Sequence, residues 1–148
     1  MMQFNMENQP VINPEEIHLF KMQVIAEKIN KALFAESKEN NLGVAHKIMH
    51  NLEDQRVKIE LVFSFKNQSN QETAFFQIDY QYQIDNMSNF YNIKENGKPI
   101  FSAQMIACLL GIGLSTSRGI IFERLEREGI KDIILPVVSP QKMINKKV

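Results

Sequence analysis

Strict alternation of apolar and polar residues is the clearest pattern in this chain. Apolar side chains occupy every second position in residues 57–65, with Val62 as the one exception, and the alternation returns in residues 76–84 after a polar stretch. A period of two is typical of a strand that buries one of its faces. The pattern therefore predicts an antiparallel hairpin with one covered face and one face open to water or to a partner.

A helical spacing of apolar residues follows in residues 101–126. Two glycines, Gly111 and Gly113, interrupt it, and because glycine costs about 1 kcal/mol relative to alanine in a helix, they predict a kink or a close helix contact. Gly129 is expected to end the helix. The apolar stripe of this predicted helix consists of Phe101, Met105, Cys108, Ile112, Ile121, Phe122 and Leu125.

The segment after this helix predicts a loop and a second, short helix. Residues 130–138 are mostly aliphatic and contain Pro136. Ser139 followed by Pro140 has the pattern of an N-cap with proline at the first helical position. A short C-terminal helix is therefore expected to begin there.

The first third of the chain is open to two interpretations. The apolar spacing in residues 17–29 favours a helix, although alternate positions partly fit a strand. Residues 42–52 predict a weak strand. Residues 1–14 are expected to form a flexible tail, and residues 15–148 a single domain, which is an ordinary size.

Composition limits the classes of function. Seventeen basic and seventeen acidic residues cancel, so the overall charge gives no reason to expect a nucleic-acid partner or a membrane surface. The single cysteine cannot form an intramolecular disulfide, and no apolar run approaches the roughly 20 residues of a membrane span. These features predict a cytoplasmic protein that is not inserted in a membrane.

Residues that could support catalysis are few. His46 and His50 lie four positions apart and form a candidate metal pair, but only Glu53 and Asp54 are nearby as further ligands. The glycine pair at 111 and 113 lacks the remainder of a phosphate-binding loop. Cys108 lies on the apolar stripe, where a buried thiol is more common than a nucleophile. We therefore expect no enzymatic activity, no cofactor and no metal.

Several short segments, in this order and spacing, resemble the SecB family of export chaperones over about residues 55–144. The resemblance implies an α+β fold, in which a four-stranded antiparallel sheet carries a long helix and a short C-terminal helix on one face. It makes residues 17–29 the first strand and 42–52 the second, and it implies a homotetramer built as a dimer of dimers. The segments are Glu72-Thr73-Ala74-Phe75 with the strand after it, Gln104-Met105, Ala107-Cys108-Leu109, Arg118 and Ile134-Leu135-Pro136-Val137.

The function implied by this resemblance is that of an ATP-independent holdase, which binds unfolded polypeptides in apolar grooves, with a role in protein export. Ordinary core packing is the alternative role for each apolar residue that would line such a groove. A second possibility is a dedicated partner-binding protein, such as a toxin–antitoxin-associated chaperone or an assembly factor. The expected client-binding residues are Phe122, Leu125, Ile130, Ile133, Leu135 and Val137.

Family members also dock the SecA motor through an acidic face of the sheet. By resemblance, Asp79 and Glu27 would belong to that face. Gln23 replaces a further expected acid, and the chain ends in Lys146-Lys147-Val148 without an acidic tail. Because charge steers such contacts, these differences are expected to weaken SecA docking and to favour other partners.

Overall fold

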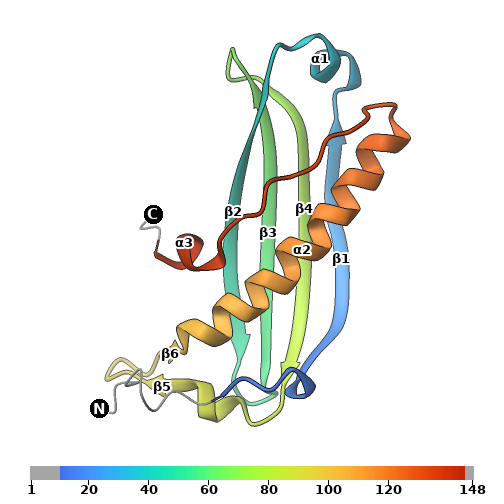
Figure 1. The fold of residues 1–148 in the computed structure, drawn as a ribbon. Helices are drawn as coiled ribbons and strands as arrows, with labels where there is room; N and C mark the ends of the chain where they lie inside the picture. The colour runs from blue at the N-terminus through green and yellow to red at the C-terminus, as the bar shows by residue number, and fades with distance from the viewer. Residues whose placement is uncertain (1–10, 146–148) are drawn as a thin grey trace.

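The computed structural model describes residues 11–145 and forms an antiparallel sheet with helices on one side (Figure 1). The predicted α+β architecture is therefore confirmed. Most of the predicted tail, residues 1–10, lies outside the described residues. The sheet contains β1 (Ile17–Ile29), β2 (Asn40–Asn51), β3 (Arg56–Asn67) and β4 (Glu72–Ile84). The predicted long and short helices are α2 (Ala103–Arg127) and α3 (Pro140–Asn145). The shorter elements are η1 (Pro14–Glu16), α1 (Lys31–Glu36), η2 (Met87–Phe90), β5 (Tyr91–Ile93) and β6 (Pro99–Phe101).

The strand order is β1-β4-β3-β2, so β1 and β2 form the two edges of the sheet. The predicted hairpin is confirmed as β3 and β4, in which Leu61 pairs with Ile78 and Ile59 with Tyr80. All four of these side chains are fully buried, because they face the helices. We call this side of the sheet the helix side and the other the open face.

β1 is a strand, as the resemblance implied, and the helix favoured by apolar spacing alone is wrong. Its pairing with β4 runs from Ile17 opposite Ile84 to Ile29 opposite Ala74, with irregularities after Leu19 and after Val24. Each irregularity inserts one residue, so the alternation of the strand shifts by one position. Apolar residues on one face are then two or three positions apart, which imitates the spacing of a helix.

Two tyrosines connect α2 to the sheet. The hydroxyl of Tyr80 is hydrogen-bonded to Ser117 Oγ, and that of Tyr82 donates to the carbonyl oxygen of Leu109 at 2.9 Å. Burial raises the pKa of Tyr80 to about 12, since the phenolate is poorly solvated there. Both hydroxyls are thereby satisfied within the core, which fixes how α2 lies across the strands.

The predicted close contact at the glycines occurs within one subunit. A Cβ atom on Gly113 would lie 3.0 Å from Leu61 Cδ1 and 3.3 Å from the Tyr80 ring, so any larger residue would require these two side chains to move. A Cβ on Gly111 would lie 3.8 Å from Pro140 in α3. α2 itself runs without interruption from Ala103 to Arg127. The predicted kink is therefore absent from α2, and the close contact of Gly113 is made with the sheet.

Both ends of the interhelix loop are as predicted. Gly129 has a φ of +78° and donates its N–H to the carbonyl of Glu126 at 3.0 Å, which ends α2 in a left-handed cap. Ser139 Oγ accepts the N–H of Lys142 at 3.4 Å at the start of α3. The loop between these caps crosses the sheet from the end of α2 to α3, which lies beside β2 (Figure 1).

α2 corrects one expectation about membranes. By length and composition α2 could cross a membrane, since its mean hydropathy is 1.7 over an 18-residue window. The expectation that no apolar stretch approaches the length of a membrane span is therefore wrong. Half of that window is buried inside the protein. A core helix of a folded domain has the same properties, and the length of α2 alone is therefore weak evidence for a membrane span.

Candidate functional site

The six predicted client-binding residues divide between the core and the surface. Leu125 is fully buried, Ile130 is 9% exposed and Leu135 is 3% exposed, so these three side chains stabilise their own subunit. Ile133 is partly buried. Phe122 is 38% exposed and Val137 is 81% exposed. A foreign chain can reach Phe122 and Val137 in this conformation, whereas it cannot reach the three buried residues.

Exposed side chains lie next to buried ones in the interhelix loop. Ile134, between the partly buried Ile133 and the buried Leu135, is 72% exposed. The accessible apolar side chains here are therefore Ile134 and Val137 of the loop and Phe122 of α2. We call these three the loop set. Sequence reasoning missed Ile134 as a binding residue, although an extended backbone with Leu135 turned inward places its neighbour outward.

Two polar contacts fix this loop to α2. Arg118 Nε donates to the carbonyl oxygen of Leu135 at 3.1 Å, and the N–H of Asp132 donates to Glu126 Oε1 at 3.1 Å. Together with the buried Leu135 side chain, they determine which face of the loop is exposed. Arg118, one of the residues on which the sequence resemblance rests, therefore has a structural role, because it positions the interhelix loop.

A second exposed apolar region lies on β1. Leu19, Phe20, Met22 and Ile25 are 41%, 44%, 46% and 46% exposed, and we call them the β1 edge set. Leu19 and Met22 lie on the helix side, because they pair with the buried Tyr82 and Tyr80. Sequence reasoning did not identify this set. The available signal was apolar residues at both odd and even positions of one strand.

The β5–β6 hairpin adds two further exposed apolar residues that were not predicted. Ile93 is 48% exposed and Ile100 is 38% exposed. The base of the hairpin is packed on the fold, since the ring of Phe101 lies 5.7 Å from that of Tyr91 and 5.5 Å from that of His50. The hairpin lies at one end of the sheet, where Phe101 contacts His50 of β2 (Figure 1).

The two carboxylates expected on one acidic face lie on opposite faces. Asp79 is on the open face, 4% exposed, with Lys58 Nζ 3.3 Å from its Oδ2. Glu27 pairs with Phe76 on the helix side, and its Oε2 accepts a hydrogen bond of 2.8 Å from Arg124 Nη1 of α2. Each charge already has an internal partner, so Asp79 and Glu27 do not form a shared acidic surface.

The candidate catalytic residues are not arranged as a site. His46 and His50 share the helix side of β2, where they pair with Leu61 and Val57, and burial lowers the pKa of His46. Within residues 11–145 no group of three His, Cys, Asp or Glu residues is close enough to bind a metal ion. Burial raises the pKa of the Cys108 thiol, which reduces its thiolate fraction and hence its nucleophilicity.

Comparison with known proteins finds similarity only among solved structures. No family model and no curated protein matches the chain. A SecB-like chaperone of Mycobacterium tuberculosis, solved in complex with a peptide from an antitoxin, shares 12% identity, with a TM-score of 0.49 over 84% of this chain and 92% of that one. A protein of unknown function from Streptococcus agalactiae shares 14% identity, with a TM-score of 0.28 over 82% and 93% of the two chains. At these identities and scores, neither similarity assigns a function.

Proposed function

We infer that this chain is an ATP-independent holdase, which binds non-native polypeptides through exposed apolar side chains. The observation that carries the proposal is the loop set: Phe122 is exposed on α2, and Ile134 and Val137 are exposed on a loop whose Leu135 is buried in the core. Burying apolar surface contributes about 25 cal/mol per Å² and requires no particular sequence in the client. Such a surface favours unfolded chains, because folded proteins have already buried their own apolar residues.

Self-association is the second part of the proposal. β1 is an edge strand with four half-exposed apolar side chains, and no strand within residues 11–145 pairs with its outer side. Such an edge is of the kind that pairs with another strand. Two copies of β1 would form a continuous sheet across a dimer. On α2, Ser115 and Gly119 are exposed and four positions apart, and nothing lies within 4 Å of a Cβ added to Gly119. Small residues at this spacing allow two helices to pack closely, which would join two dimers into a tetramer.

A tetramer would increase the affinity for clients. Each loop set offers only a small apolar area, so binding by one subunit is weak. Four loop sets on one assembly raise the effective concentration of the second and later contacts, as long as the client is extended enough to reach them. This dependence on an extended client would give selectivity for the unfolded state.

The direct test is suppression of aggregation. A chemically denatured protein that aggregates on dilution is mixed with the chain, and light scattering is recorded at stoichiometric ratios without ATP. We expect scattering to be suppressed. Unchanged scattering, under conditions in which an established holdase succeeds, would reject the holdase proposal. Light scattering of the protein alone gives its mass, and a monomer would reject the tetramer.

A dedicated partner-binding role is the second candidate, and the positions of Asp79 and Glu27 favour it over general export. Since these carboxylates lie on opposite faces, the acidic docking surface for a SecA-type motor lacks its expected residues. A chaperone for one partner, such as an antitoxin or an assembly intermediate, needs no such surface. Native co-purification distinguishes the two roles, because one dominant partner supports the dedicated role and a broad set of nascent proteins supports the general one.

A further inference from the structure

The open face of the sheet is separate from the loop set, and the proposed holdase activity does not depend on it. Strand pairing aligns its side chains in rows across four strands, and none of the helices in the described part of the chain covers it (Figure 1). One row runs from Lys21 through Gln81 and Lys58 to Met49. Another runs from Lys28 through Phe75 and Ser64 to Gly43. A partner on this face would therefore meet side chains from all four strands.

The open face carries an excess of positive charge although the whole chain is neutral. Three carboxylates accompany the cations, namely Glu60, Glu72 and Asp79, and two of these, Glu60 and Asp79, already lie within 3.6 Å and 3.3 Å of Lys58 Nζ. Counted over the strand residues of this face, six cations against three carboxylates leave a net charge of +3, while Asp85, just after β4, pairs with His18 of the same face. The six cations are Lys21, Lys28, Lys47, Arg56, Lys58 and Lys66.

Most of these cations are available to a partner. Within residues 11–145 the four exposed lysines of this face form no ion pair, and the Arg56 guanidinium lies 4.8 Å from the centre of the Phe20 ring. An unpaired surface cation attracts an anionic group without first breaking an internal ion pair. The four exposed lysines are Lys21, Lys28, Lys47 and Lys66.

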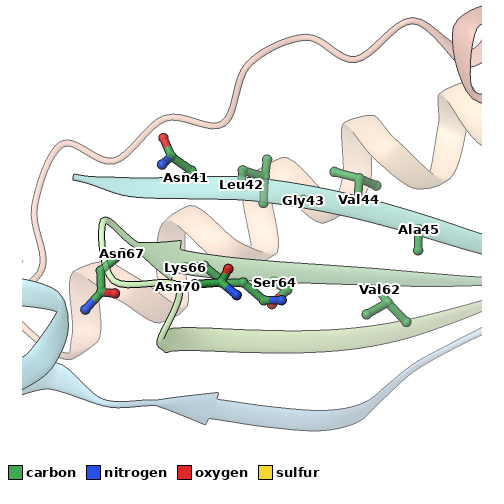
Figure 2. A pocket seen from close by; sticks show the side chains of 10 residues that line it. All are labelled: Asn41, Leu42, Gly43, Val44, Ala45, Val62, Ser64, Lys66, Asn67 and Asn70. Carbon is green, nitrogen blue, oxygen red and sulfur yellow. The ribbon is translucent and has the colours of Figure 1, made fainter.

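Two hollows lie along the seam between β2 and β3. The larger, of about 480 Å³, contains Lys66 and has small side chains in its wall, since Gly43, Ala45 and Ser64 line it (Figure 2). In Figure 2 the side chains of Ala45 and Val62, from neighbouring strands, point to the same side. The seam therefore has a shallow floor of small residues.

The smaller hollow, of about 240 Å³, lies at the other end of the seam. Arg56 and Lys58 line it together with the amides of Asn51 and Gln81. From Lys66 to Arg56 the strand spans about 33 Å, at the usual rise of a strand. Cations thus lie at both ends of a shallow track whose length suits an extended peptide of about ten residues.

We propose that the open face binds an extended, acidic polypeptide segment along the β2–β3 seam. Its carboxylates would contact Lys66 at one end and Arg56 at the other, and its backbone would lie over the small residues Gly43, Ala45 and Ser64 near Lys66. Midway along the seam Glu60 is opposite Lys47 and 3.6 Å from Lys58 Nζ, so this carboxylate has cations beside it. A nucleic acid fits less well, because a net charge of +3 is modest for a polyanion. One side of the most exposed aromatic ring on this face, Phe20, already carries the Arg56 guanidinium, so only the remaining surface of the ring is left for stacking on a base.

Fluorescence anisotropy with a labelled peptide of about twelve alternating glutamates and serines tests the proposal. An otherwise identical glutamine–serine peptide is the neutral probe. We expect the acidic peptide to bind at least about tenfold more tightly than the neutral one, and its affinity to fall about tenfold between about 50 and 300 mM salt. Equal binding of the two peptides overturns the proposal.

Charge reversal locates the site. The triple variant Lys47→Glu, Arg56→Glu and Lys66→Glu should lose acidic-peptide binding by at least about tenfold. The matched control reverses three exposed lysines elsewhere, Lys38→Glu, Lys94→Glu and Lys131→Glu, with the same change in net charge. The control should retain binding. Equal losses in both variants would show a general charge effect and overturn the assignment to the seam.

Two further measurements separate the alternatives. A single-stranded oligouridylate of about twelve nucleotides is titrated at the same salt, and tighter binding of this RNA than of the acidic peptide overturns the choice of a polypeptide partner. Aggregation suppression is measured for the open-face triple variant. Because that variant leaves the loop set unchanged, suppression should equal that of the wild type, and a parallel loss would overturn the independence of the two surfaces.

Discussion

The two edge strands of the sheet, β1 and β2, differ in how far other segments of the chain cover their apolar side chains. On the helix side of β2, Leu42, Val44 and Ile48 are partly buried and pack against the core, and the interhelix loop and α3 lie over this edge (Figure 1). On β1, Leu19 and Met22 remain more than two-fifths exposed. The protein thus covers one edge with its own chain and leaves apolar side chains exposed on the other. The difference teaches that the helix side of an edge strand stays exposed where no other segment of the chain packs on it, as at Leu19 and Met22.

Placing charges on β1 is the most severe test of this difference. In the double variant Met22→Lys and Ile25→Lys, four apolar side chains per dimer are lost from the proposed interface. At about 1 kcal/mol for each half-exposed side chain, the dissociation constant of the assembly should rise about a thousandfold. Sedimentation or light scattering would show a shift to monomer.

The matched control places lysines on the opposite edge, in the variant Asn41→Lys and Ala45→Lys. Both positions are exposed and point to the open face. The oligomeric state should not change, since β2 is not expected to pair with another copy. Equal dissociation of both variants would show that added charge, and not the β1 edge, is responsible.

Shortening the Leu135 side chain, which holds the interhelix loop in the core, should weaken the packing of this loop over β2. Leu135 is 3% exposed, so Leu135→Ala removes buried methyl groups and leaves a cavity, with an expected loss of about 2–5 kcal/mol in the free energy of unfolding. Val137, two residues away, is 81% exposed, and Val137→Ala should change it by less than about 0.5 kcal/mol. Urea titration measures both, and similar losses would contradict the assigned anchor.

The loop set should affect client binding with little effect on stability. In the triple variant Phe122→Ser, Ile134→Ser and Val137→Ser, the concentration needed to suppress aggregation should rise by about tenfold, because each subunit loses its exposed apolar contacts. A triple serine variant of Val11, Ile93 and Ile100, which are also exposed, is the control. If this control loses as much activity, the client site is not specific to the loop.

The smallest expected effect is a pH dependence of stability due to His46, which lies on the covered edge strand β2. Burial lowers the pKa of His46 in the folded protein, below the ordinary value of 6.5 in the unfolded chain. The unfolded state therefore takes up a proton first as the pH falls, and the free energy of unfolding should decrease below about pH 6.5. Above that pH both states are neutral at this residue, and no dependence is expected. In His46→Leu the decrease should be smaller, and an unchanged slope in urea titrations would contradict this role.

Most of the fold followed from local patterns. The alternation in β3 and β4, the spacing in α2 and the capping residues Gly129 and Ser139 each specify an element through contacts within a few positions of the chain. β1 is the exception. Its two inserted residues, Phe20 and Ile25, disturb the alternation, and only pairing with β4 decides that the segment is a strand.

The candidate site was predicted only in part, because exposure depends on what packs against each residue. The sequence alone identified an aliphatic loop between two helices, which is enough to expect apolar contacts there. It could not decide that Leu135 is buried while Ile134 and Val137 are exposed, since the contact of Arg118 with the Leu135 carbonyl sets the orientation of the loop. In the same way, the sequence determined a neutral chain, but only the pairing of four strands collected six of its cations on one face, because side-chain direction in a sheet depends on register.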